Sequence, residues 1–357
     1  MSENKLTFVN VNQKDRRIFI DPSYPVFNLD GLFNLADPVL NRDNQLLSFY
    51  RLRQKLLSHN GSVHTADYLL NKMPSEDASE CEYYSLGIIR NYEKVASGKL
   101  ANLAAFIYME PPIVAPELYK ELPKLTATFD QVYIPNVHGD GYSLEGVDVT
   151  KLRKMYWPIP YNEVLEPFWS CNDRVKRIVV INGNHKPVSR FHEQYSTRID
   201  AMIELSNFGV VDLFGRGWDR WWSRSALWLP YWRNRSKLMS IYKGVCVSKF
   251  EVLQRYEFCL CFENMAMDGY ITEKIFDCFY AGVIPLYLGA PDISEYIPTT
   301  AYINCRKFSS WAAMWEEIST MTNQEIELMR EAGRLFLGSE EALPFFNSTE
   351  NIVGDGK

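Results

Sequence analysis

The stretch CFENMAMDGYITEK, residues 261–274, changes character halfway along its length. An apolar run ends abruptly in Glu263 and Asn264, and a short loop that contains a glycine follows. After Thr272 the apolar residues recur with the spacing of a helix face, up to Gly282. The stretch therefore predicts a buried strand, a polar loop, and a helix with Thr272 as its N-cap and Gly282 at its end.

The predicted helix start collects groups that suit an anionic ligand. In a strand-helix-strand unit, ligands bind at the carboxyl ends of the strands, where the unpaired N–H groups and the dipole of the helix favour negative charge. Lys274 adds a positive charge, and Glu263 and Asn264 lie close to the same place. Taken alone, Thr-Glu-Lys has a simpler interpretation, in which Glu273 supports the dipole and Lys274 is a solvated surface charge. The neighbouring carboxylate and amide favour a diphosphate that carries hydroxyl groups.

Length, composition and charge limit the class of protein. The chain has 357 residues, more than one hydrophobic core usually serves, and no apolar segment is long enough to cross a bilayer. A formal charge of -6 disfavours nucleic acid as the main partner. The polar first residues predict a cytoplasmic protein without an export signal. Seven cysteines without paired spacing predict buried free thiols.

Predicted strands alternate with predicted helices along the chain. The runs with strand character are Ile18–Ile20, Val63–Leu69, Tyr84–Ile89, Ala104–Met109, Arg177–Ile181, Val210–Phe214, Phe258–Phe262 and Val283–Leu288. Residues 44–58 carry a helical pattern, and the alternation is typical of an α/β fold with largely parallel sheets. Two prolines in Trp157–Tyr161 suggest a stiff segment that connects two domains. We therefore expect one domain at residues 1–165 and a second at residues 166–357.

Residues 256–291 carry a longer and more specific pattern, YEFCLCFENMAMDGYITEKIFDCFYAGVIPLYLGAP. This segment strongly resembles the donor-binding motif of the α-1,3/α-1,4-fucosyltransferases, glycosyltransferase family 10. Lys249 and the segment Tyr302–Phe308 also fit the family, and a weaker match places Arg198 at the family's arginine, before Gly215. The resemblance implies a GT-B type fold, in which two Rossmann-like domains face each other across a cleft. The first domain would bind the acceptor and the second a GDP-sugar donor.

The resemblance also implies which residues bind the GDP-sugar. They are Arg198, Lys249, Glu263, Asn264, Tyr270, Thr272, Glu273 and Lys274. Met265 stands where the family usually has a serine. The identity of the donor sugar, fucose or a related 6-deoxy sugar, is therefore left open. Arg198 and Lys274 would neutralise the charge on departing GDP, which is the part that a metal plays in other transferases. Because no Asp-x-Asp pair lies at a strand end near this site, we expect no obligatory metal or other cofactor.

The segment Tyr108–Pro112, YMEPP, supplies a candidate general base. Sugar transfer with inversion needs a base that takes the proton of the acceptor hydroxyl, and Glu110 follows a predicted strand of the first domain at a rigid proline turn. A glutamate in that position is more often a surface residue. The segment resembles the part of the family's sequence in which an aromatic strand leads to the catalytic glutamate. This resemblance implies that Glu110 is the base.

Residues 216–237 interleave tryptophans with arginines and a lysine. Such a segment suits an acceptor sugar, a lipid-linked acceptor or an anionic membrane surface. The alternative interpretation is that the tryptophans pack in the core and the arginines pair with acidic groups of a negatively charged protein. The sequence leaves this choice open.

The motifs and the resemblance predict an inverting glycosyltransferase. We expect it to move L-fucose from GDP-fucose to a hydroxyl, O3 of an N-acetylglucosamine or glucose unit, of a cell-surface glycan or lipopolysaccharide precursor. The expected partners are the GDP-sugar, an oligosaccharide or lipid-linked acceptor and, through residues 216–237, the inner face of a membrane. Two alternatives remain: a transferase for another GDP-6-deoxy sugar, and a non-catalytic nucleotide- or carbohydrate-binding protein of the same fold.

Overall fold

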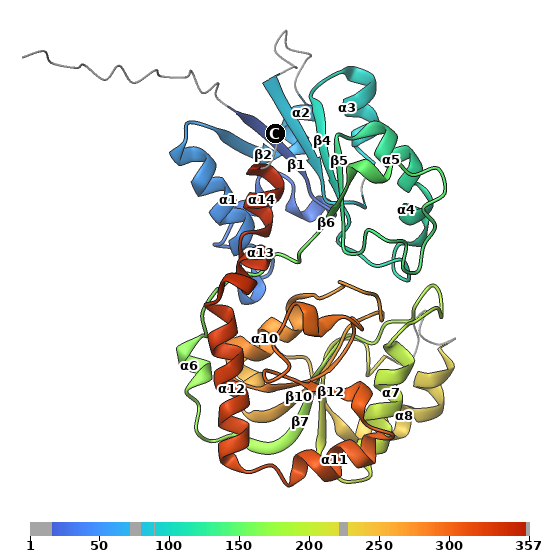
Figure 1. The fold of residues 1–357 in the computed structure, drawn as a ribbon, viewed down its shortest axis with the longest axis vertical. Helices are drawn as coiled ribbons and strands as arrows, with labels where there is room; N and C mark the ends of the chain where they lie inside the picture. Colours follow the sequence, from blue (N-terminus) through green and yellow to red (C-terminus); the bar gives the residue numbers. More distant parts are fainter. Residues whose placement is uncertain (1–15, 72–79, 89, 221–227, 355–357) are drawn as a thin grey trace, which may run out of the picture.

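The computed structural model describes residues 16–71, 80–88, 90–220 and 228–354. This part of the chain forms two α/β domains, which Figure 1 draws one above the other with the N-terminal half at the top. Each domain is built on a six-stranded parallel sheet with helices on either side. The predicted α/β class is therefore confirmed.

The sheet of the first domain has the strand order β2-β1-β3-β4-β5-β6, and neighbouring strands are parallel. Its strands are β1 (Arg17–Asp21), β2 (Ser62–Thr65), β3 (Cys81–Ser85), β4 (Asn102–Ile107), β5 (Gln131–Ile134) and β6 (Leu152–Lys154). The helices are α1 (Leu47–Ser58), α2 (Ala66–Leu70), α3 (Tyr92–Gly98), α4 (Pro116–Lys120) and α5 (Leu122–Thr128). The carboxyl ends of β4, β5 and β6 approach the second domain, which places the residues that follow these strands at the boundary.

The sheet of the second domain has the strand order β12-β11-β10-β7-β8-β9, again with parallel neighbours. Its strands are β7 (Val175–Ile181), β8 (Val211–Phe214), β9 (Tyr242–Gly244), β10 (Tyr256–Phe262), β11 (Ile284–Leu288) and β12 (Ile303–Asn304). The helices are α6 (Glu166–Trp169), α7 (Tyr195–Ser206), α8 (Leu229–Ile241), α9 (Lys249–Leu253), α10 (Glu273–Ala281), α11 (Trp311–Ser319) and α12 (Asn323–Leu337). β10 lies in the interior of the sheet, so its apolar run is buried from Phe258 to Phe262.

The structure corrects three predicted strands and adds short ones; the strand predicted at Ala104–Met109 begins at Asn102 and ends at Ile107. The strand predicted at Val63–Leu69 ends at Thr65, because the Thr65 N–H donates to the Asp30 carboxylate (2.9 Å) and the chain turns into α2. The strand predicted at Tyr84–Ile89 begins earlier and ends at Ser85. β5, β6, β9 and β12 have four residues or fewer in the described chain, too few to show a period.

The last described helices return to the first domain. α13 (Leu343–Phe346) leads into α14 (Ser348–Gly354), which lies beside α1 in the upper domain of Figure 1. Arg16 donates to the Val353 carbonyl (2.8 Å), and Arg51 lies 3.8 Å from the Glu350 carboxylate. A division at residue 165 thus separates the two sheets, whereas α14 packs on the first domain. Among the described helices, none combines the length and the apolar composition that crossing a bilayer requires.

Candidate active site

The stretch at residues 261–274 folds as the sequence predicts. β10 ends at Phe262, a loop follows, and α10 begins at Glu273 with Thr272 as its N-cap residue. Gly282 closes the helix with a φ of 67°, in the left-handed region that glycine adopts without strain. We call residues 263–272 the β10–α10 loop.

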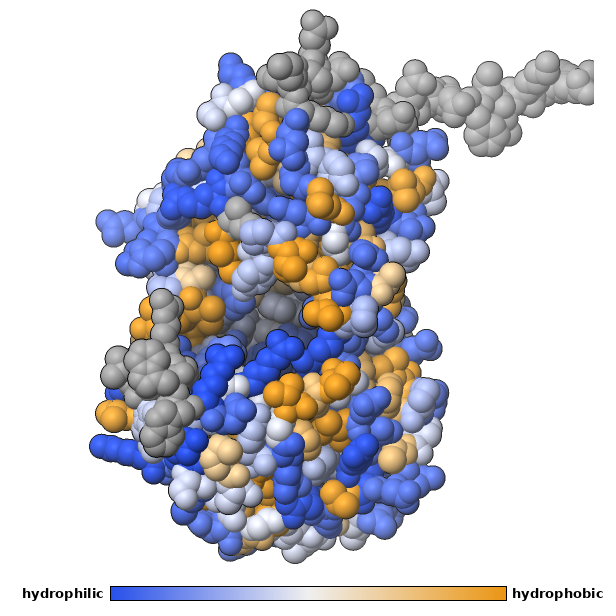
Figure 2. Space-filling view, turned by 180° about the vertical axis from the view of Figure 1, so that it is seen from behind, coloured by the Kyte–Doolittle hydropathy of each residue, from blue (hydrophilic) through white to orange (hydrophobic). Residues whose placement is uncertain are grey.

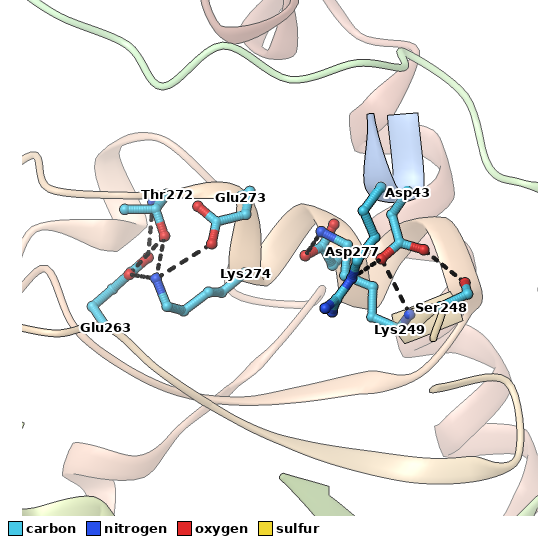
Figure 3. Close-up of polar contacts among 9 residues, drawn as sticks. Asp43, Ser248, Lys249, Glu263, Thr272, Glu273, Lys274 and Asp277 are labelled. Carbon is cyan, nitrogen blue, oxygen red and sulfur yellow. Dashed lines mark hydrogen bonds and ion pairs between the residues drawn. The ribbon is translucent and has the colours of Figure 1, made fainter. Parts of the chain in front are cut away.

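Glu263 is a fully buried carboxylate that fastens the start of α10. One of its oxygens accepts a hydrogen bond from the Thr272 N–H (2.8 Å), and the other accepts from the Thr272 hydroxyl (2.7 Å) and from Lys274 Nζ (3.0 Å; Figure 3). Because the Thr272 hydroxyl donates to this carboxylate, α10 begins without a side-chain cap. The positive end of the helix dipole is therefore open to an anion.

Lys274 lies between two carboxylates at the same helix start. Its Nζ is 3.0 Å from Glu263 and 3.6 Å from Glu273. Burial alone would lower the pKa of Lys274, but Glu263 and Glu273 outweigh it and hold the pKa well above its ordinary value. Lys274 is therefore a cation at neutral pH, and it lines the cleft together with Glu273.

Lys249, the first residue of α9, connects α9 to α10. Its Nζ lies 2.6 Å from the Asp277 carboxylate. Burial opposes the charged form of Lys249, but Asp277 and Glu273 outweigh it, so the pKa is raised. Asp43 of the first domain accepts from the Lys249 N–H (3.2 Å) and from the Ser248 hydroxyl (2.7 Å; Figure 3). A carboxylate of one domain thus caps a helix of the other.

Arg198, on α7, is buried behind the end of β10. Its Nη2 donates to the carbonyl oxygens of Phe262 (2.7 Å) and Glu263 (3.1 Å). Burial lowers the pKa of Arg198, and burial together with the Arg198 charge lowers the pKa of His185. The structure therefore brings Arg198 to the predicted site, where its observed contacts support the strand end.

Asn264 and Tyr270 lie at the two ends of the β10–α10 loop. The Asn264 carbonyl accepts from the Gln194 N–H (2.9 Å), and the Asn264 side chain is partly exposed. Tyr270 is buried, and burial together with the Glu263 and Glu110 carboxylates raises its pKa. Tyr270 directly follows Gly269, whose carbonyl accepts from Lys154 of the first domain, so Tyr270 lies near that domain.

Met265, the departure from the family pattern, packs between the domains. It is fully buried and forms an antiparallel bridge with Glu193. A Cβ added to Gly141 of the first domain would lie 2.6 Å from the terminal methyl of Met265. The methionine thus fills space beside a first-domain glycine.

Glu110 stands opposite the start of α10, on the other domain. The Tyr119 hydroxyl donates to the main-chain carbonyl of Glu110 (2.9 Å), which fixes the turn after β4. Burial raises the pKa of the Glu110 carboxyl above 4.5, the positive charge of Lys274 opposes this, and the negative charge of Glu273 adds to it. The predicted base thus faces the start of α10 from the other domain, where the charges of Lys274 and Glu273 act on its carboxyl.

A cleft follows the carboxyl ends of the second sheet. A cavity of ≈ 850 Å³ is lined by residues after β7, β8 and β9, and one of ≈ 230 Å³ shares Arg42 with it and reaches Lys249 and Lys274. The larger cavity is also lined by Lys186, Arg216 and Arg220. Figure 2 shows the hollow between the domains, with hydrophilic residues along the rim of the lower, second domain. The cleft is thus rich in positive charge.

Sequence reasoning missed most residues of the larger cavity. Arg42 belongs to the first domain, in the 3-10 turn Arg42–Asn44, so no local motif connects it with the second. Gly215 gave a signal, because it directly follows a predicted strand. It has a φ of +141°, and an added Cβ would lie 1.9 Å from the Asn182 carbonyl oxygen. Only glycine allows the ends of β7 and β8 to approach so closely.

The segment 216–237 is partly described, because residues 221–227 lie outside the described chain. Trp218 and Trp228 are buried in the core, and Trp232 packs against it. The Trp218 indole donates to the Asn182 carbonyl (2.7 Å). These three tryptophans are packing residues, and the membrane contact stays a prediction.

Comparison with known proteins identifies the second domain. Residues 184–330 match the profile of glycosyltransferase family 10 (fucosyltransferase), C-terminal part. Most of the second domain thus carries the sequence profile of glycosyltransferase family 10. The family expected from residues 256–291 is thereby confirmed.

Curated relatives match parts of this chain. The alpha-(1,3)-fucosyltransferase FucT of Helicobacter pylori is 38% identical over 64 residues, which are 18% of this chain and 13% of that protein. The GDP-fucose protein O-fucosyltransferase 3 of Mus musculus is 42% identical over 156 residues, 44% of this chain and 27% of that protein. The matches thus span much less than two thirds of the relatives' own lengths.

A solved α1,3-fucosyltransferase shares the fold of the whole chain. The TM-score is 0.52 with 15% identity, over 96% of this chain and 92% of that one. The expected GT-B fold is confirmed. Within the described residues, no group of three or more His, Cys, Asp or Glu side chains is arranged to hold a metal ion.

Proposed function

We propose that this protein is an inverting fucosyltransferase that binds GDP-fucose on its second domain and activates the acceptor with its first. The observation that carries the proposal is the position of Glu110, which follows β4 on the first domain and faces Lys274 and Glu273 at the start of α10 on the second. A base on one side and a phosphate-binding cation on the other are what a displacement at the carbon between them requires.

The proposed reaction is a single displacement. Ionised Glu110 accepts the proton of the acceptor hydroxyl while the hydroxyl oxygen forms a bond to the anomeric carbon of fucose. The bond from that carbon to the diphosphate oxygen breaks, and its electron pair leaves with GDP. Attack from the side opposite GDP inverts the configuration of the carbon. Lys274 and the N-terminus of α10 stabilise the charge on the departing diphosphate.

The other predicted residues fall into two groups: those that would contact the GDP-sugar, and those that hold the site in place. Lys249 and Glu273 line the cleft beside Lys274, so we assign them to the phosphates and to hydroxyl groups of the nucleotide. Glu263 and Arg198 are buried and bonded to protein groups, so we assign them to holding the strand end and helix start in place. Tyr270 and Thr272 are buried too, and Thr272 is bonded to Glu263, so we assign them to the same support. Asn264, which is partly exposed, would then border the sugar, and the ≈ 850 Å³ cavity would take the rest of the nucleotide.

The acceptor is proposed to bind beside Glu110, on the side of the first domain. An apolar groove of ≈ 240 Å³ there is lined by Pro112, Tyr119 and Tyr142 of the first domain and by Phe191 of the second, among others. Such faces suit the apolar side of a sugar ring. We propose as acceptor O3 of an N-acetylglucosamine or glucose unit in a cell-surface glycan or lipopolysaccharide precursor, with the protein in the cytoplasm at the inner face of the membrane.

A transferase for another GDP-6-deoxy sugar is a second candidate. Met265 favours it, because this side chain is buried and offers no hydroxyl where the family has serine. A non-catalytic binding protein of the same fold is the remaining alternative, and it gives no reason for a carboxyl opposite Lys274.

The test uses the full chain with GDP and a panel of GDP-sugars. GDP and GDP-fucose should raise the melting temperature, because a ligand that binds only the folded state stabilises it. GDP-fucose should then be consumed only when a glycan acceptor is present, with GDP release measured by chromatography. Consumption of a different GDP-sugar would favour the second candidate, and stabilisation without turnover of any would favour a binding protein. No stabilisation by GDP would contradict the proposed site.

A further inference from the structure

The β10–α10 loop is held by side chains of the other domain. The Asp268 N–H donates to the Asp140 carboxylate (2.9 Å), and the Asp268 carbonyl accepts from the Asn136 side-chain amide (3.2 Å). The Gly269 carbonyl accepts from Lys154 Nζ (2.7 Å). Asn136, Asp140 and Lys154 belong to the first domain, so that domain binds three main-chain groups within two residues of the loop.

Lys154 is a bridge between the two domains. It ends β6, and its Nζ also donates to the Pro135 carbonyl (2.5 Å), at the end of β5. The same Nζ lies 4.9 Å from the centre of the Tyr296 ring, on the second domain. Burial lowers the pKa of Lys154 to about 8, although Asp292 and Asp268 oppose this. A lysine withdrawn from water and bonded to carbonyls of both domains is not a solvated surface charge.

The contact between Lys154 and residue 269 requires a glycine. Its φ is +71°, and an added Cβ would lie 2.0 Å from Lys154 Nζ and 2.7 Å from the Pro135 carbonyl oxygen. Both the left-handed backbone and the close approach exclude a side chain. The Gly269 N–H donates to Asp292 of its own domain (2.8 Å), so the glycine peptide is fixed from both sides.

The loop links the residue that the proposed function assigns to the sugar with the residues that support the start of α10. It contains Asn264 near its beginning and Tyr270 and Thr272 at its end. Asp268 and Gly269 are therefore a point through which a displacement of the first domain reaches the groups at the start of α10.

We propose that Lys154, with Asn136 and Asp140, is a positioning residue that sets the β10–α10 loop for binding of the nucleotide sugar when the domains are docked. Lys154 acts through the main chain of Gly269 and touches neither sugar nor phosphate. The consequence for nucleotide binding rests on the proposed function, whereas the control of the loop by the first domain does not.

The experiment compares Lys154→Met with Lys151→Met in the full chain. Lys151 Nζ donates to the Phe129 carbonyl (2.8 Å) within the first domain, so Lys151→Met also removes a lysine-to-carbonyl bond but leaves the boundary intact. In Lys154→Met, hydrogen exchange at residues 266–272 should become at least about tenfold faster while both sheets keep their protection. The dissociation constant of GDP should rise by about the same factor. Lys151→Met should change neither quantity.

Unchanged exchange at residues 266–272 in Lys154→Met would overturn the proposal, as would faster exchange throughout both sheets, which indicates a general loss of stability. If exchange responds as expected but the parent protein does not bind GDP, the loop is set by Lys154 and the proposed function is wrong. Gly269→Ala provides a second route if Lys154→Met fails to fold. The double variant should be no worse than the poorer single one, because both changes break the same contact.

Discussion

The two sides of the cleft are built in opposite ways. On the second domain, Lys274 and Lys249 each lie within hydrogen-bonding distance of a carboxylate, and Glu263 is bonded on both oxygens. On the first domain, Glu110 makes no ion pair with the described residues, and the charges that act on its pKa come from across the cleft. The side proposed to bind phosphate is therefore fixed by ion pairs within its own domain, whereas Glu110 on the opposite side has no ion pair with the described residues. Proton transfer and nucleotide binding should then be separable by mutation.

The largest effect is expected on the free carboxyl. Glu110→Gln keeps the shape of the side chain but cannot accept the acceptor proton, so the transfer rate should fall by about 10² to 10⁴. Glu117→Gln is the control, because Glu117 is an exposed partner of Lys120 on α4. Transfer by Glu110→Gln at the parental rate would remove the residue from the mechanism.

A smaller effect is expected on the paired side. Lys274→Met removes a charge-assisted contact with phosphate, so GDP affinity should fall by about 10- to 100-fold. Lys120→Met, at an exposed ion pair, should leave the affinity unchanged. Titration calorimetry with GDP measures both variants. If Lys274→Met binds GDP like the parent protein, the phosphates bind elsewhere.

The pH dependence should connect the two sides. Glu110 acts in its ionised form, so kcat/KM should fall as pH decreases through the pKa of Glu110, which burial raises above 4.5. Lys274 favours the ionised form and Glu273 opposes it. The pH at which kcat/KM falls on the acidic side should therefore be higher in Lys274→Met and lower in Glu273→Gln. Residual activities measured from about pH 4 to 8 give the midpoints. If this midpoint moves in neither variant, the fall of kcat/KM at low pH reports the titration of a group other than Glu110.

Chelation should have the smallest effect. Because Lys274 and the α10 N-terminus are assigned to the leaving diphosphate, transfer should continue in excess EDTA. Loss of transfer that manganese or magnesium restores would show that a metal carries the charge instead.

The difference between the two sides also explains what the sequence could predict. The strand end at Glu263, the N-cap position of Thr272 and the closing Gly282 follow one another in the chain, so spacing and residue type were sufficient. The neighbourhood of Glu110 and Lys274 is not local, because it depends on how two separate sheets face each other. The resemblance gave both residues a role, but no pattern in the chain gave their proximity.

Residues that bridge the domains were beyond sequence reasoning for the same reason. Arg42 and Asp43 lie in a short 3-10 turn, and Lys154 ends a strand of three residues. Neither element has a periodic signal, and the partners of these residues come from the other half of the chain. Arg198 was expected to bind the donor, and its position behind the end of β10, with bonds to the carbonyls of that strand, required the fold.

The central claim is that Glu110 serves proton transfer and the second domain serves nucleotide binding. The most direct test is the dissociation constant of GDP for Glu110→Gln, measured by titration calorimetry on the same preparation that is assayed for transfer. The account predicts a constant within about threefold of the parental value while transfer is reduced by at least about 10². A loss of GDP affinity as large as the loss of transfer would contradict it, because Glu110 would then shape the nucleotide site instead of taking a proton.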